Sequence, residues 1–201
     1  MKSIIILAAL SSAIAYADTH ANIMRNVSFT TERSETYQTE AGELRIDYRG
    51  MSYEYNSNVF LHHAQRASRM MPDFLEQQGV TGLERCRDQS INVYDVETQT
   101  LNQNAIYETV NWGDPNRQGR YGSDLLGLYD KGDSARDPAT IYTDIELYFP
   151  ERIRIISHEM AHFWYDQYCL STRDINSEEL AQAFETFYRE NSRNRKYGRP
   201  Y

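Results

Sequence analysis

The sequence predicts an α+β domain in which a small mixed sheet packs on a long buried helix and on a following C-terminal helix. Short segments with strand-like patterns recur between residues 44 and 145, separated by turn-rich loops. From residue 150 onward the pattern changes to two successive helices. The chain of 201 residues, with 40% hydrophobic and 25% charged residues, has the size and composition of one globular domain.

The N-terminus has the pattern of a signal peptide. A positively charged start precedes an apolar run over residues 4–15, which is too short to span a bilayer. The segment Ala15-Tyr16-Ala17 then offers small residues to signal peptidase. We therefore expect residues 1–17 to be removed, and an uncleaved membrane anchor is the alternative.

The remaining chain is expected to be an exported, monomeric domain. Residues 18–40 are polar and predict a loose lead-in, followed by a single folded domain over residues 41–201. The formal net charge of −8 argues against nucleic acid as the main partner. No later segment is apolar enough to cross a bilayer, so we expect no membrane contact after cleavage and a secreted or periplasmic location.

The chain has two cysteines, Cys86 and Cys169. Export implies an oxidising compartment, where an even number of cysteines favours a disulfide bond. We expect a Cys86–Cys169 disulfide, and a pair of buried thiols is the alternative.

The first predicted elements are a hairpin and a helix. Alternation over residues 44–48 predicts a strand, Arg49-Gly50 a turn and residues 52–55 a returning strand. Asn58 can cap a helix whose apolar residues recur at helical spacing. Pro72 should kink this helix or split it in two.

Four further strands and two helices complete the predicted order. The strands cover residues 91–96, 105–110, 125–129 and 140–145. A buried helix should run from Pro150 to about Cys169, because a broad apolar face extends along it. Asn176 should cap the last helix, with Glu179 as its capping-box partner.

The segment His158-Glu159-Met160-Ala161-His162 predicts a zinc site. Histidines four residues apart on a helix stand one above the other and can bind one ion. Glu159 lies about 100° round the helix from His158, beside the ion rather than on it. That position suits a general base acting on a water in the open fourth position.

A catalytic zinc site needs a third protein ligand, and no histidine follows His162. The third ligand must then be a carboxylate. The candidates on the following turn and helix are Asp174, Glu178, Glu179 and Glu185.

The segment from Asn176 to Glu185 resembles the second-helix pattern of the gluzincins, Asn-Glu-Gly-x-Ala-x-x-x-Glu. This resemblance implies that Glu178 is the third zinc ligand, that Glu185 is the second Glu of the pattern, and that residues 41–201 form a zincin-like catalytic domain. It also likens residues 140–145 to the edge strand that lines the substrate cleft. Glu179 replaces the usual Gly of the pattern, which leaves Glu179 open as the ligand.

The expected activity is peptide-bond hydrolysis by a zinc-activated water, with Glu159 as general base and acid. Two alternatives stay open: a zincin-fold binding module without turnover, and a zinc hydrolase of a non-protein amide.

Larger gluzincins often have a further subdomain that supplies a hydrogen-bond donor to the oxyanion of the reaction. In this chain, the candidates for that donor are Tyr165, Tyr188, Tyr197 or a loop tyrosine. Gln182 is a candidate to hold a zinc-binding histidine, whereas the adjacent His62 and His63 are expected to be one packed and one exposed side chain.

Overall fold

The computed structural model describes residues 29–39, 42–50, 54–87, 90–96, 127–131, 138–144, 147 and 149–198. The predicted signal peptide, residues 1–17, and the predicted strand 105–110 lie outside these ranges. None of the described helices combines the length and the apolar character that crossing a membrane requires.

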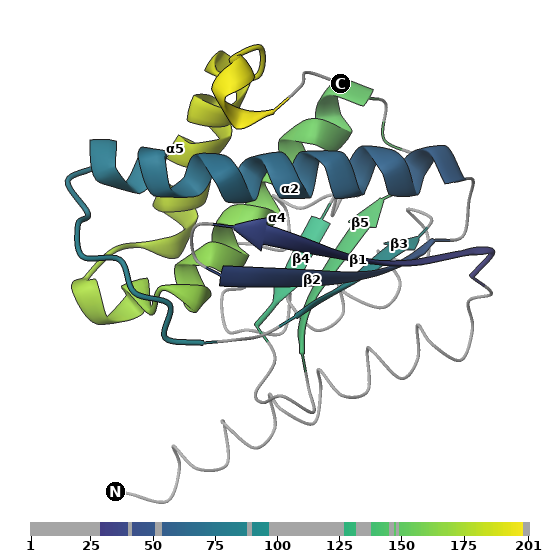
Figure 1. Ribbon diagram of the computed structural model, residues 1–201, viewed down its shortest axis with the longest axis horizontal. Helices are drawn as coiled ribbons and strands as arrows, with labels where there is room; N and C mark the ends of the chain where they lie inside the picture. The colour runs from purple at the N-terminus through teal and green to yellow at the C-terminus, as the bar shows by residue number, and fades with distance from the viewer. Residues whose placement is uncertain are drawn as a thin grey trace, which may run out of the picture.

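The described strands form one mixed sheet, which confirms the α+β class. They are β1 (Thr31–Thr39), β2 (Gly42–Gly50), β3 (Ile91–Val96), β4 (Gly127–Asp130) and β5 (Ala139–Asp144), in the spatial order β1-β2-β3-β5-β4. The pairs β2–β3 and β3–β5 are parallel, whereas β1 and β4 run antiparallel to their neighbours. In Figure 1, α2 (Glu54–Gln77) crosses this sheet, and α4 (Phe149–Gln167) packs beside α5 (Ser177–Glu190).

The N-terminal strand β1 lies inside the segment predicted to be a loose lead-in, so that prediction is wrong for residues 31–39. Along β1, half-buried side chains alternate with exposed ones, but almost all of them are polar, so the sequence shows no alternation of apolar and polar residues.

The hairpin is also formed by other residues than predicted. It joins β1 to β2, and Arg49 and Gly50 continue β2 instead of forming a turn. Because Gly50 has no side chain, it leaves space for the Tyr48 ring: a Cβ at this position would lie 2.6 Å from the Tyr48 hydroxyl oxygen.

The helix α2 begins at Glu54, four residues before the predicted cap Asn58, and it includes Tyr55 of the predicted returning strand. It also continues through Pro72, so the prediction of a split helix is wrong. Buried side chains on both sides of the proline hold the helix against the core. They are Met70, Met71, Phe74 and Leu75.

The two C-terminal helices agree closely with the sequence. α4 ends at Gln167, and the predicted disulfide between Cys86 and Cys169 follows, with a Cα–Cα distance of 6.0 Å. Cys169 and Asp174 have positive φ angles and flank a short 3-10 helix, which reverses the chain. The Asn176 side chain then accepts hydrogen bonds from the backbone N–H groups of Glu178 and Glu179, which confirms it as the cap of α5.

The core lies between the sheet and the three helices. The side chains that face the helices from β2, β3 and β5 are buried, and the Trp164 indole N–H donates to the Ser68 hydroxyl to connect α4 with α2. The largest fully buried side chains include Trp164, Tyr48, Phe60, Phe163 and Phe184.

Of the adjacent pair, His63 is packed and His62 is half-buried. The Nδ1 atom of His63 lies 2.6 Å from the Tyr188 hydroxyl, which connects α2 with α5. Burial, followed by the nearby His62 and Arg66, lowers the pKa of His63 to about 3.

The depressed pKa of His63 predicts acid sensitivity. An unfolded histidine has a pKa of about 6.5. Between pH 6.5 and 3, His63 is therefore protonated in the unfolded chain but stays neutral in the folded chain. The free energy of unfolding should therefore fall by about 3 kcal/mol from this group as the pH drops from 6.5 to 4. Urea titrations across this range should show a shallower decline for His63→Gln. Equal slopes for the variant and the wild type would contradict the assignment.

Candidate metal centre

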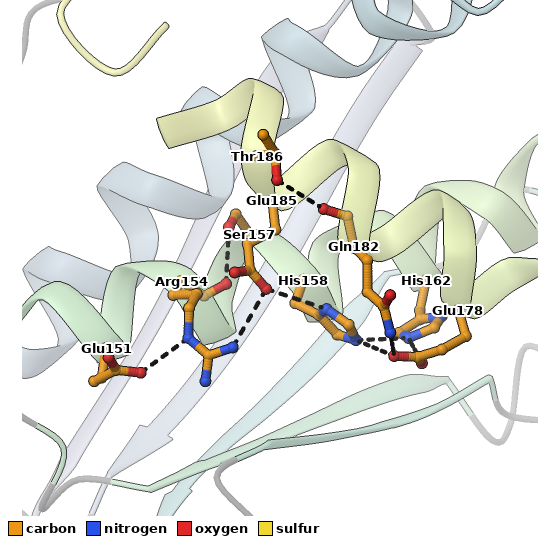
Figure 2. A network of polar contacts seen from close by, with 9 residues as sticks. All are labelled: Glu151, Arg154, Ser157, His158, His162, Glu178, Gln182, Glu185 and Thr186. Atoms are coloured by element: carbon orange, nitrogen blue, oxygen red, sulfur yellow. Dashed lines mark hydrogen bonds and ion pairs between the residues drawn. The ribbon is translucent and has the colours of Figure 1, made fainter. Parts of the chain in front are cut away.

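Three predicted ligands meet where the first turn of α5 faces α4. His158 and His162 lie on consecutive turns of α4, and their Nε2 atoms are 3.2 Å apart. Glu178 approaches both, with Oε1 3.6 Å from His158 Nε2 and Oε2 3.5 Å from His162 Nε2. Figure 2 shows the three side chains converging between the two helices. Within the described ranges, this is the group of His, Cys, Asp and Glu side chains that could hold a metal ion.

The other candidate third ligands lie elsewhere. Glu179 is exposed and is not part of this group, and Asp174 is exposed, with a positive φ angle, before α5. Glu185 approaches the opposite nitrogen of His158, with Oε2 3.6 Å from Nδ1. Of the four carboxylates considered, the structure therefore brings Glu178 to the two Nε2 atoms.

The outward nitrogen of His162 has a close hydroxyl partner. Its Nδ1 lies 2.7 Å from Oγ of Ser177, the residue directly before Glu178. A neutral imidazole that presents a lone pair at Nε2 must carry its proton on Nδ1, and the Ser177 oxygen is placed to accept that hydrogen bond. The first turn of α5 thus supplies both Glu178 and Ser177, the hydrogen-bond partner of His162.

His162 is also fixed on its ring face, by Tyr129 of β4. The two rings stack with centroids 6.1 Å apart and an angle of 12° between their planes. The Tyr129 hydroxyl donates to Asp166 Oδ2 at 3.0 Å, one helical turn beyond His162. Tyr129 therefore connects the strand β4 to the ligand-bearing face of α4.

His158 lies at one end of a chain of side-chain contacts that continues through Glu185 and Arg154. Glu185 lies between His158 and Arg154, whose Nη1 is 3.5 Å from Glu185 Oε2. Arg154 also donates through Nε to Glu151 Oε2 at 2.9 Å. Figure 2 shows this chain along α4, with Glu185 reaching across from α5. A carboxylate beside the outer nitrogen is a common way to orient a metal-binding histidine.

The predicted role of Gln182 is corrected by the structure. Its amide Nε2 donates to Glu178 Oε1 at 2.9 Å, so it holds the carboxylate rather than a histidine. Gln182 and Glu178 are four residues apart on α5 and share one helical face. The side chain beside the outer nitrogen of His158 is Glu185.

The protonation states in this cluster are shifted by burial and by neighbouring groups. Burial, followed by the nearby His158, lowers the pKa of His162 to about 4, so this imidazole is neutral near pH 7, as metal binding requires. For Glu178, burial acts upward, but the Gln182 hydrogen bond and the two histidines outweigh it and the pKa is lowered. These two groups therefore have the charge states that a cation needs in its ligands.

Glu159 lies on another side of α4, facing β4, and it is buried. Burial, followed by the Glu178 charge, raises its pKa to about 8. Gly127 of β4 leaves the necessary space, since a Cβ there would lie 2.7 Å from Glu159 Oε1 and would also clash with Ile155. A carboxyl group that titrates near neutral pH can both accept and return a proton.

The edge strand beside α4 is β4 rather than the predicted 140–145 segment. The strand β5 is paired with β3 on one side and with β4 on the other, so its backbone has no open edge. Among the described strands, β4 ends the sheet next to α4. A strand pattern in the sequence specifies no lateral position in a sheet, so the resemblance assigned the edge to the wrong strand.

Three tyrosines that were candidate oxyanion donors are engaged elsewhere. Tyr165 donates to the Ile175 carbonyl at 2.7 Å, Tyr188 contacts His63, and Tyr197 is buried against α2. The residues that the sequence reasoning missed are Gly127, Tyr129 and Ser177. The first two carried no motif, whereas Ser177, directly beside the proposed ligand on the capped turn, could have been considered.

Comparisons with protein-family models, with curated proteins and with solved structures found no match for this chain.

Proposed function

We propose that this protein is a zinc-dependent metallopeptidase in which His158, His162 and Glu178 hold the ion. The observation that carries the proposal is the convergence of the two Nε2 atoms and the Glu178 carboxylate at 3.2–3.6 Å from one another. Bonds of about 2.0–2.1 Å to a tetrahedral zinc ion place neighbouring ligand atoms about 3.3 Å apart. Three protein ligands with one open position are typical of catalytic zinc sites, whereas structural sites are closed by four.

Glu159 is the general base in this proposal. A zinc ion held by the three ligands would supply Lewis-acid chemistry and make a water acidic near neutral pH. Glu159 follows His158 directly in α4 and is not one of the three converging side chains. Its carboxylate accepts the proton from the attacking water and returns it to the nitrogen that leaves.

The strand β4 supplies the place for a peptide substrate. It ends the described sheet beside α4, and its residues Gly127 and Tyr129 contact Glu159 and His162. An extended peptide can add to such an edge through main-chain hydrogen bonds. The scissile bond would then lie beside the ligand group.

The resemblance of residues 176–185 to the gluzincin pattern supports the same reading, including a zincin-like fold. The N-terminal signal pattern and the Cys86–Cys169 disulfide favour a secreted or periplasmic setting. A peptidase cleaves peptides, a hydrolase of non-protein amides cleaves other amides, and a zinc-holding binding module cleaves neither. Activity measurements therefore separate the three.

The test pairs metal analysis with digestion of a peptide library. We expect about one zinc per purified wild-type chain, loss of the metal in Glu178→Ala and retention in Glu179→Ala. Glu179 is the matched control, because it is the exposed neighbour of the ligand on the same helix turn. Peptide cleavage should disappear with a chelator and return when zinc is added.

Each other outcome contradicts a specific part of the proposal. Metal loss in Glu179→Ala but not in Glu178→Ala would show that the third ligand is Glu179 and not Glu178. Stoichiometric zinc without cleavage of any library peptide would contradict peptidase activity. In that case, release of amines from non-protein amides would separate a hydrolase from a binding module.

A further inference from the structure

The carboxylate of Glu178 is held asymmetrically. Each of its oxygens faces one histidine, with Oε1 3.6 Å from His158 Nε2 and Oε2 3.5 Å from His162 Nε2. Oε1 also accepts a hydrogen bond of 2.9 Å from the Gln182 amide. Figure 2 shows the Gln182 side chain extending along α5 to reach Glu178. The two oxygens of this carboxylate therefore have different surroundings.

This asymmetry matters because a carboxylate can bind a cation through one oxygen or through both. With two histidines and one carboxylate oxygen, an ion has three protein ligands and keeps a fourth tetrahedral position open. If both carboxylate oxygens bind, the coordination number rises and the position for water or substrate is crowded. The orientation of the carboxylate plane decides between these two states.

We propose that Gln182 is a positioning residue that keeps Glu178 a one-oxygen ligand, with Oε2 toward the ion and Oε1 retained by the amide. The proposal rests on the metal site proposed above and adds a residue outside the ligand set. Gln182 does not touch the ion or the substrate, and it acts through Glu178.

The chemistry of the glutamine side chain fits this task. An amide N–H₂ donates to a carboxylate without carrying a charge. A lysine or arginine in this place would put a positive charge beside the ion, and an aspartate or glutamate would repel Glu178. The four-residue spacing on α5 lets the amide reach one carboxylate oxygen without distorting the helix.

The experiment measures the coordination number with Co²⁺ as the probe ion. Four-coordinate Co²⁺ absorbs visible light more strongly than five- or six-coordinate Co²⁺, so the spectrum reports the geometry independently of activity. Wild type, Gln182→Met and Gln182→Ala are loaded with Co²⁺ and compared at equal bound metal. The variant Ala183→Met is the control, since it places the same side chain at the exposed neighbouring position.

We expect the two Gln182 variants to lose a large part of the visible absorption per bound Co²⁺ and the control to retain it. Their Zn²⁺ affinity or kcat should change by about 10-fold or more, as is usual when a partner of a metal ligand is removed. Both substitutions are compatible with an exposed helix position, and circular dichroism checks the fold.

Two outcomes overturn the proposal, and they are distinguishable. An unchanged Co²⁺ spectrum in both Gln182 variants removes the role of Gln182 and leaves the peptidase proposal standing. A wild-type protein that binds neither Co²⁺ nor Zn²⁺ removes both proposals together.

Discussion

Replacing Glu159 by Gln should abolish peptide hydrolysis and leave the metal content at the wild-type level. The amide has nearly the same shape as the carboxylate but cannot accept the proton of the attacking water. Loss of a general base typically costs a factor of about 10²–10⁴ in rate. Because Glu159 is not part of the converging ligand group, the ion should still bind.

The stability of the Glu159→Gln variant distinguishes this loss from a folding defect. The carboxyl group is buried beside Gly127, where an uncharged amide is tolerated at least as well. The thermal midpoint should therefore be equal or higher, while kcat/KM falls. Glu190→Gln, on the exposed end of α5, is the control and should keep full activity. Undiminished cleavage by Glu159→Gln would refute the assigned role.

Replacing Asp95 by Asn should destabilise the fold by about 3–5 kcal/mol, the usual cost of breaking a buried ion pair. Asp95 is fully buried in β3 and pairs with Arg152 at the start of α4. It also accepts hydrogen bonds from the Tyr48 hydroxyl at 2.5 Å and from the Thr143 hydroxyl at 2.9 Å. Asn can keep part of these contacts, but it leaves the Arg152 guanidinium buried without its counter-charge.

A surface ion pair in the same sheet provides the control. Asp47 of β2 pairs with Arg45 on the exposed face, so Asp47→Asn should cost no more than about 1 kcal/mol. Urea unfolding of both variants measures the difference. Joint replacement of the pair, as Asp95→Leu with Arg152→Met, should recover part of the stability, because neither partner of this pair is then left buried without its counter-charge. Equal losses for Asp95→Asn and Asp47→Asn would contradict the role of the buried pair.

The sequence predicted best what depends on neighbours within one helix. The spacing of His158 and His162, the apolar face of α4 and the Asn176 cap are all local, and the structure retains each of them. Cysteine pairing was predicted correctly for a different reason, since two cysteines allow only one intramolecular bond. The choice of Glu178 as the proposed third ligand needed the family resemblance, because the sequence offered four candidate carboxylates after His162.

The errors concern features that only the assembled sheet determines. The strand β1 has no apolar alternation, because both of its faces are at least partly exposed. The lateral place of β4 follows from its pairing with β5, which no residue pattern in either strand specifies. Gly127 matters only because Glu159 packs against it, and Tyr129 only because His162 lies under its ring. Such contacts join residues far apart in the chain.

The disulfide gives the fold a closed ring of chain. Cys86 and Cys169 are 83 positions apart, and the ring contains β3, β4, β5 and α4, including both histidines, whereas Glu178 lies outside it. Closing a ring of this length lowers the entropy of the unfolded chain by an amount worth about 4.5 kcal/mol in a loop-entropy model. Glu178 follows the ring closely, because only a short stretch of chain separates it from the crosslinked Cys169. Formation of this crosslink would thus shorten the conformational search by which α4 and α5 find each other.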